Sequence, residues 1–253
     1  MLTNQTVDHL RAMKLKGFAE GYLRQMSMNH LQELSFDERL GMLVDEEWLS
    51  RQNRKHRRLI QQARLRDNAS IEGIDYTHHR GLDKSLVQRL AQGTWLKENQ
   101  NIIITGPTGV GKTYLACAFG NLACRTYHSV RYYRLPRLLS DIAISRGDGS
   151  YIRLIESLRK VHVLILDEWG LAPFTAHESL EILEVLEDRT FQSCTIITGQ
   201  VPPKHWHELM PDPTVADAIM DRLIHAAHII ELKGDSMRKN RPKPAPRDEV
   251  SDG

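Results

Sequence analysis

Three groups of residues in this 253-residue chain have types and spacing that suit phosphate chemistry. The first is the run Gly106-Pro107-Thr108-Gly109-Val110-Gly111-Lys112-Thr113, a G-x-x-x-x-G-K-[ST] loop. In such a loop backbone N–H groups surround phosphate oxygens, the lysine neutralises the β/γ-phosphates and the hydroxyl ligates Mg²⁺. We therefore expect the whole run to bind ATP, with Lys112 catalytic and Thr113 a metal ligand. A glycine-rich turn in an unrelated domain is the alternative, and the flanking strand and helix patterns disfavour it.

The second group is the acidic pair Asp167 and Glu168, which follows the apolar run Val161–Leu166. This pattern predicts a buried strand that ends in two carboxylates, and neighbouring residues on a strand point to opposite faces. We expect Asp167 to hold Mg²⁺ with Thr113, and Glu168 to orient and deprotonate the attacking water. An acidic pair that merely ends a strand is the alternative, but the P-loop upstream favours ATP hydrolysis.

The third group consists of polar residues at the ends of later elements. Thr198 and Gln200 follow a predicted strand, where either one could bond the water or a phosphate oxygen; as ordinary strand-end residues they would have no such role. Arg222 and Arg238 also lie near element ends, and an arginine can stabilise charge on a transferring phosphoryl group. On local sequence alone, a surface arginine is the more common interpretation.

The elements that must position these residues differ in type along the chain. Residues 1–68 have helical spacing of apolar residues, and Ser35 with Glu38 fits a capping box that begins a helix. That helix carries an apolar stripe made of Leu40, Val44 and Trp48. We expect residues 1–68 to form a small all-helical domain for DNA binding or oligomerisation.

Beyond this domain, β-branched strands alternate with amphipathic helices. Residues 69–82 lose periodicity and contain two glycines, which predicts a linker. Residues 83–238 then predict an α/β domain whose parallel sheet is flanked by helices. The basic, proline-containing residues 239–253 predict a flexible tail.

Charge is segregated along the chain, although 34 basic and 32 acidic residues leave a net charge of only +2. Residues 51–66 contain basic side chains and no acidic one. A solvated helix face is the alternative, but mutual repulsion on one helix favours a polyanionic partner. Arginines interleaved with tyrosines in 131–137 also suit nucleic acid, although such a strand can simply bury one face. The predicted DNA contacts are Arg51, Arg54, Lys55, Arg57, Arg58, Arg131, Arg134 and Arg137.

Cysteine usage and apolar run length point to the compartment. Cys117, Cys124 and Cys194 form no C-x-x-C pair, so buried thiols in a reducing compartment are expected rather than a disulfide framework. Apolar stretches such as Val163 to Leu166 are far too short to cross a bilayer. We expect a cytoplasmic protein without a membrane partner.

In this order, the P-loop, Leu164–Glu168, Thr195–Gln200, Ala216–Leu223 and Glu231–Lys239 resemble the IstB family of insertion-sequence transposition helpers. These are AAA+ ATPases related to DnaC helicase loaders. The resemblance implies an AAA+ core, with Gln200 as sensor and Arg222 as arginine finger, and places Arg238 near the nucleotide. It also implies ATP-driven self-assembly on double-stranded DNA, remodelling of that DNA, recruitment of an IstA-type transposase, and disassembly on hydrolysis.

Two other classes stay open. A DnaC-like loader would prefer single-stranded DNA and bind a replicative helicase. A P-loop small-molecule kinase would be monomeric and indifferent to DNA, and would have less need of an acidic pair that activates water.

Overall fold

The computed structural model describes residues 2–28, 33–225 and 227–237. The chain divides into two compact units, Met1–Gln61 and Gln62–Gly253, each described below by itself. Residues 62–68, which the sequence grouped with the helical domain, thus fold with the second unit. The predicted flexible tail, 239–253, lies outside the described residues.

The first unit is helical, as the spacing of its apolar residues predicts. Its helices are α1 (Leu2–Ala12), α2 (Lys16–Ser27) and the first part of α3 (Phe36–Ala63). A small core of Val7, Leu10 and Ala19 joins α1 to α2, with Phe18 and Tyr22 packed against it. The capping box is present: the Ser35 backbone N–H donates to Glu38 at 2.8 Å, and the Glu38 N–H donates to the Ser35 hydroxyl at 3.3 Å.

A buried acid on α3 holds the start of α2. Glu47, 7% exposed, accepts from the backbone N–H of Gly17 at 2.7 Å and of Phe18 at 3.2 Å. These N–H groups have no partner within α2, and a carboxylate at a helix N-terminus also interacts favourably with the helix dipole. Glu47 therefore fixes the packing of α2 against α3.

The apolar stripe predicted on α3 is not part of this core. Leu40, Val44 and Trp48 are 38%, 52% and 59% exposed in the described part of the chain. The helix is thus where the sequence places it, but the stripe is exposed and is not among the residues of the α1–α2 core.

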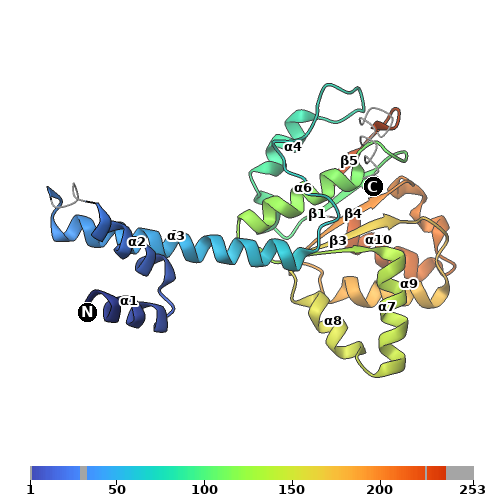
Figure 1. The fold of residues 1–253 in the computed structure, drawn as a ribbon. Helices are drawn as coiled ribbons and strands as arrows, with labels where there is room; N and C mark the ends of the chain where they lie inside the picture. The colour runs from blue at the N-terminus through green and yellow to red at the C-terminus, as the bar shows by residue number, and fades with distance from the viewer. Residues whose placement is uncertain (1, 29–32, 226, 238–253) are drawn as a thin grey trace, which may run out of the picture. The chain divides into compact units, whose positions relative to one another are not determined.

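The second unit is built on a five-stranded parallel sheet with the order β2-β3-β4-β1-β5 (Figure 1). The strands are β1 (Asn101–Thr105), β2 (Val130–Arg134), β3 (Val163–Trp169), β4 (Cys194–Gly199) and β5 (Ala227–Glu231). The helices between them are α6 (Lys112–Arg125), α7 (Leu135–Asp148), α8 (Tyr151–Arg159), α9 (Ala176–Glu187) and α10 (Pro213–Ile224), with a 3₁₀ turn over Pro203–Leu209. These elements match the predicted alternation closely.

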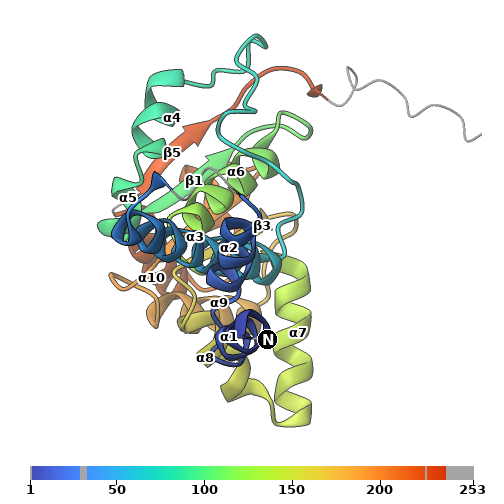
Figure 2. The same ribbon diagram turned by 60° about the vertical axis from the view of Figure 1, so that its left-hand side comes forward.

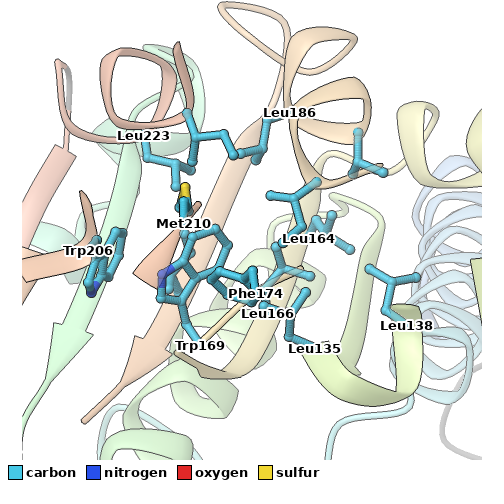
Figure 3. Close-up of a cluster of buried hydrophobic side chains, with 14 of the residues drawn as sticks. Leu135, Leu138, Leu164, Leu166, Trp169, Phe174, Leu186, Trp206, Met210 and Leu223 are labelled. Carbon is cyan, nitrogen blue, oxygen red and sulfur yellow. The ribbon is translucent and has the colours of Figure 1, made fainter. Parts of the chain in front are cut away.

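Helices cover both faces of this sheet, with α6 on one face and α7, α9 and α10 on the other (Figure 1). Alternate strand residues supply the two faces: Leu164 and Leu166 join the α7–α10 core, whereas Ile165 approaches α6 at Gly120. Figure 3 shows the core on the face covered by α7, α9 and α10, where the rings of Trp169 and Phe174 pack with their centroids 5.4 Å apart. Strands buried on both faces explain their nearly continuous apolar sequences.

Two short helices, α4 (Lys84–Ala91) and α5 (Thr94–Lys97), precede β1 and were not expected from the sequence. Asp83 begins α4 by accepting from the backbone N–H groups of Ser85 and Leu86. Trp95 of α5 is fully buried. Figure 2 shows α4 and α5 beside the end of the sheet where β1 pairs with β5. Among the described residues, no helix is both long and apolar enough to cross a membrane.

Candidate nucleotide site

The glycine-rich loop lies between β1 and α6, in the order that a P-loop requires. Gly106 has φ of 143° and Gly111 has φ of 96°, backbone conformations that residues with a Cβ rarely adopt. A Cβ on Gly106 would also collide with the Leu232 carbonyl, which follows β5. The loop therefore leads directly into the N-terminus of α6, where free N–H groups and the helix dipole favour an anion.

Two cations hold the loop in shape. The Lys112 ammonium donates to the carbonyls of Gly106 and Pro107, at 2.7 Å each. Arg80, only 4% exposed, donates to the Val110 carbonyl at 2.9 Å and to the Asp75 carbonyl at 2.8 Å. Burial lowers the pKa of this guanidinium. Arg80 therefore ties the predicted linker to the P-loop.

The Asp167 carboxylate, at the end of β3, is surrounded by hydroxyl donors from β2, β4 and α6. The Thr113 hydroxyl lies 3.1 and 3.0 Å from its two oxygens, the Tyr132 hydroxyl donates at 2.5 Å, and Thr198 donates as well. Burial, and then the bond to Asp167, raise the pKa of the Tyr132 phenol. The register explains the meeting, because β2 and β4 both flank β3 and all three carboxyl ends lie at one edge of the sheet.

Glu168 is bonded by two arginines. Arg134 donates to its Oε2 atom at 2.7 Å, and Arg66 lies 3.4 Å from Oε1 and 3.6 Å from Asp167. Hydrogen bonding to Glu168 raises the pKa of Arg134. The Glu168 side chain is 23% exposed.

A backbone irregularity brings both acids to the same cleft. The β3–β4 register pairs Leu166 with Ile197 and Trp169 with Gly199, so β3 contains one extra residue here, and Glu168 has φ of 68°. Such bulges re-aim side chains beside functional sites. Strand alternation alone would have separated Asp167 from Glu168, whereas the bulge places both along one cavity.

The cavity at this edge has a volume of about 670 Å³, which suits a nucleotide. Its lining includes Lys112, Thr113 and both acids, together with Asp75 and His78 from the predicted linker. Gln200 is exposed and also lines it, whereas Thr198 is fully buried against Asp167. The two predicted sensor candidates thus occupy different positions: Thr198 touches the predicted metal ligand and Gln200 faces the open cleft.

Of the two remaining predicted nucleotide contacts, the structure describes only Arg222. Arg222 is absent from the described residues that line the cleft, and instead pairs with Glu187 at 2.8 Å while donating to the Ala218 carbonyl at 2.8 Å. Arg238 lies outside the described residues.

The predicted DNA contacts fall into two sets. On α3, Arg51 and Arg54 pair with Glu47 at 2.6 and 3.3 Å, so the assumption that the basic block is uncompensated is wrong for these two. Lys55, Arg57 and Arg58 are exposed.

In the second unit, Arg131 donates to the Gln62 carbonyl at 3.1 Å, and Arg137 pairs with Asp141 at 3.1 Å. Arg134 is exposed and bonds Glu168. The interleaved tyrosines point inward: Tyr132 bonds Asp167 and Tyr133 packs against the core. The arginines, rather than the aromatic rings, are therefore what this strand presents to a partner.

Sequence reasoning missed three residues of this site: Arg66, Arg80 and Tyr132. Arg66 was counted within a basic helix, but α3 ends at Ala63 and Arg66 lies in the cleft. Tyr132 was weighed as a base-stacking residue. The one signal in the sequence for Arg80 was its positive charge within the irregular segment 69–82.

The fold and the site together define a P-loop fold of the AAA+ type, with a parallel sheet, a glycine-rich loop after β1 and two acids at the end of β3. The chain belongs to the family of IstB-like ATP binding proteins, whose profile matches residues 8–245. It is 46% identical over 241 residues to a Sinorhizobium fredii protein named as an insertion sequence ATP-binding protein, covering 95% of this chain and 98% of that one. The corresponding IS21 protein of Pseudomonas aeruginosa is 31% identical, over 94% and 89%.

Solved structures show the same fold. DnaI superposes with a TM-score of 0.56 at 24% identity, covering 65% of this chain and 91% of that one. AMPPCP-bound DnaA from Aquifex aeolicus also has a TM-score of 0.56, at 20% identity and over 69% and 53% of the two chains. The predicted AAA+ fold and IstB resemblance are therefore confirmed.

Proposed function

We propose that this chain is an ATP-hydrolysing, DNA-binding helper of transposition. The observation that carries the proposal is the meeting of Thr113, Asp167 and Glu168 beside a P-loop, in a member of the IstB-like family. A P-loop alone binds nucleotide, whereas an acid placed to activate water adds hydrolysis.

ATP binds with its phosphates on Gly106–Thr113, where Lys112 turns from the loop carbonyls to the β/γ oxygens. Thr113 and Asp167 are fitted to hold Mg²⁺, because hydroxyl and carboxylate oxygens suit this ion and theirs lie 3.0 Å apart. When held there, the ion would supply charge neutralisation on the phosphates. Tyr132 and Thr198 orient the Asp167 carboxylate.

Hydrolysis then needs a positioned water. Glu168 orients that water and accepts its proton, which places the oxygen in line with the γ-phosphate. Gln200, exposed in the cleft, serves as the sensor that bonds the γ-phosphate, and Thr198 is the alternative sensor. Arg222 lies outside the cleft of its own subunit, which supports a role as arginine finger toward the ATP of a neighbouring subunit.

The biological role follows from the family and from charge. The relatives are named as proteins of insertion sequences, which supports a role in transposition. We infer that ATP-bridged subunits assemble on duplex DNA through exposed arginines, remodel it, and recruit an IstA-type transposase. Hydrolysis then releases the assembly. Contacts of this kind are to phosphates, so binding will be weakly sequence-selective and salt-sensitive.

The decisive experiment measures ATPase activity and particle size with and without duplex DNA, for the wild type and Glu168→Gln. The variant should bind ATP normally, hydrolyse it at least about 100-fold more slowly than the wild type, and accumulate DNA-bound oligomers. Lys112→Ala, which removes phosphate binding, is the control that should form no such oligomers. Unimpaired hydrolysis by Glu168→Gln would refute the role of Glu168. Preference for single-stranded DNA would favour the helicase loader instead, and a DNA-independent monomer that phosphorylates a metabolite would favour the kinase.

A further inference from the structure

We propose that subunits assemble head to tail, with the Phe191 ring of one copy inserted into an apolar groove of the next copy, beside the cleft that receives Arg222. This inference rests on the proposed function, because it takes Arg222 to act on the ATP of a neighbouring subunit. It adds the apolar contact that holds the two copies together. The occupant of the groove is thus a second copy of this chain.

The apolar groove lies directly beside the nucleotide cleft and has a volume of about 600 Å³. Leu135 and Phe174, both labelled in Figure 3, line it together with Leu139. Glu168 and Leu171 line both the groove and the cleft, so the two cavities share a wall. A groove lined by leucine and phenylalanine side chains suits an aromatic ring, and buried aromatic anchors dominate the affinity of many interfaces.

Phe191 is an exposed aromatic residue in a backbone conformation that its side chain disfavours. It lies between α9 and β4, is 77% exposed, and has φ of 59°, which bulky residues rarely adopt. The turn is held in place, because the Asn99 side chain donates to the Phe191 carbonyl at 2.9 Å and the Gln192 N–H donates to the Arg189 carbonyl at 3.1 Å. Strain of this kind gathers at binding sites, so we infer that Phe191 contacts a partner.

The groove of the same subunit is out of reach of Phe191. Phe191 precedes β4, whereas Thr198 and Gln200, at the other end of this strand, line the cleft that adjoins the groove. A strand of this length separates its two ends by about 20 Å. A second copy must therefore supply the ring.

Two faces of the subunit are complementary in kind. On one face, Phe191 and Arg222 together line a small cavity of about 40 Å³, which places a ring beside a cation. On the other face, an apolar groove adjoins a phosphate-binding cleft. When Arg222 reaches the ATP of the next copy, Phe191 meets the groove beside that ATP. Because the two faces differ, the contact repeats from copy to copy, as in a ring or a helical filament.

Cysteine cross-linking tests this contact directly, because the three native cysteines are buried. Gln192→Cys places a thiol beside Phe191 and Ala143→Cys places one in the groove, and both positions are exposed. The full-length variants would be incubated with AMPPCP, Mg²⁺ and duplex DNA, then treated with a short bismaleimide. A mixture of the two variants should give covalent dimers, and neither variant alone should do so.

The opposite results have distinct meanings. Dimers formed by Gln192→Cys alone would show that like faces meet, which overturns the head-to-tail contact. If the mixture gives no dimers, and a monothiol reagent labels Ala143→Cys as fast in the assembled protein as in the free protein, the groove is open to another partner and the proposal is wrong.

Phe191→Asn removes the ring and retains the fold, because asparagine tolerates a positive φ. Its Tm should equal or exceed that of the wild type. The protein concentration at which half of the chains assemble should rise about tenfold. Ile152→Asn is the matched control, since Ile152 is 71% exposed and is not among the described residues that line the three cavities. It should assemble as the wild type does, and equal weakening of both variants would contradict a specific role of Phe191.

Hydrolysis separates this inference from the proposed function. Phe191→Asn should bind a fluorescent nucleotide normally, hydrolyse ATP slowly below its raised assembly midpoint, and reach the wild-type rate above it. If Phe191→Asn assembles at the wild-type concentration while Glu168→Gln still loses hydrolysis, the inference fails and the proposed function stands. A wild type that neither assembles on duplex DNA with ATP nor depends on Glu168 for hydrolysis overturns both.

Discussion

Replacement of Arg80 by methionine should lower both the stability of the second unit and its affinity for nucleotide. Arg80 is 4% exposed and bonds the Val110 and Asp75 carbonyls at 2.9 and 2.8 Å. Methionine retains much of the volume but leaves both carbonyls without this donor. Each hydrogen bond from a charged donor contributes about 1.5 to 3 kcal/mol to stability. Part of this loss is offset, because the variant no longer has to bury a charged guanidinium.

The expected net loss is about 2 to 3 kcal/mol, which for a unit of this size lowers Tm by about 4 to 12 °C. ATP affinity should fall about tenfold, because the P-loop must then be ordered by the ligand itself. Thermal unfolding followed with and without ATP, and titration with a fluorescent nucleotide, measure the two effects.

Arg125→Met is the matched control for Arg80→Met. Arg125 pairs with Glu72 at the surface, so its loss should change stability by less than about 1 kcal/mol and leave nucleotide affinity intact. Wild-type Tm and ATP affinity in Arg80→Met would refute the reasoning that this arginine braces the loop.

Three further outcomes are expected. Thr198→Val should lower the apo Tm by a few degrees because the buried hydroxyl that bonds Asp167 is lost, whereas Gln200→Ala should leave Tm unchanged and reduce only hydrolysis; the reverse pattern would exchange their roles. Arg222→Ala and Lys112→Ala, each inactive alone, should recover ATPase activity when mixed, and no recovery would rule out action between subunits. Burial raises the pKa of Cys194 to about 12, so a thiol reagent at pH 8 should label it only after unfolding; rapid labelling of the native protein would contradict this burial.

The predictability of the site depended on how far apart its residues lie in the chain. Gly106–Thr113 is one contiguous run between a strand and a helix, so its function could be predicted from local spacing. Asp167 and Glu168 likewise end a recognisable apolar strand. The sheet order and the bulge that aims both acids into one cleft involve β4, and no local pattern specified them.

Some predictions from the sequence were wrong because they did not include the neighbouring residues that pair with or cover a side chain. Glu47 lies just before the basic block and neutralises Arg51 and Arg54, although the count from residue 51 onward excluded it. The stripe at Val44 predicted a helix correctly but not burial, because burial requires an opposing surface that the spacing of one helix cannot supply.

The sequence by itself determined the fold class, the P-loop and the two acids, because each is encoded by neighbouring residues. Tertiary structure alone decided that Arg66, 102 positions before Glu168, and Tyr132, 35 before Asp167, would surround the acids. The physical reason is the parallel sheet: it places β2 beside β3 and gathers the carboxyl ends of its strands at one edge, whatever their separation along the chain.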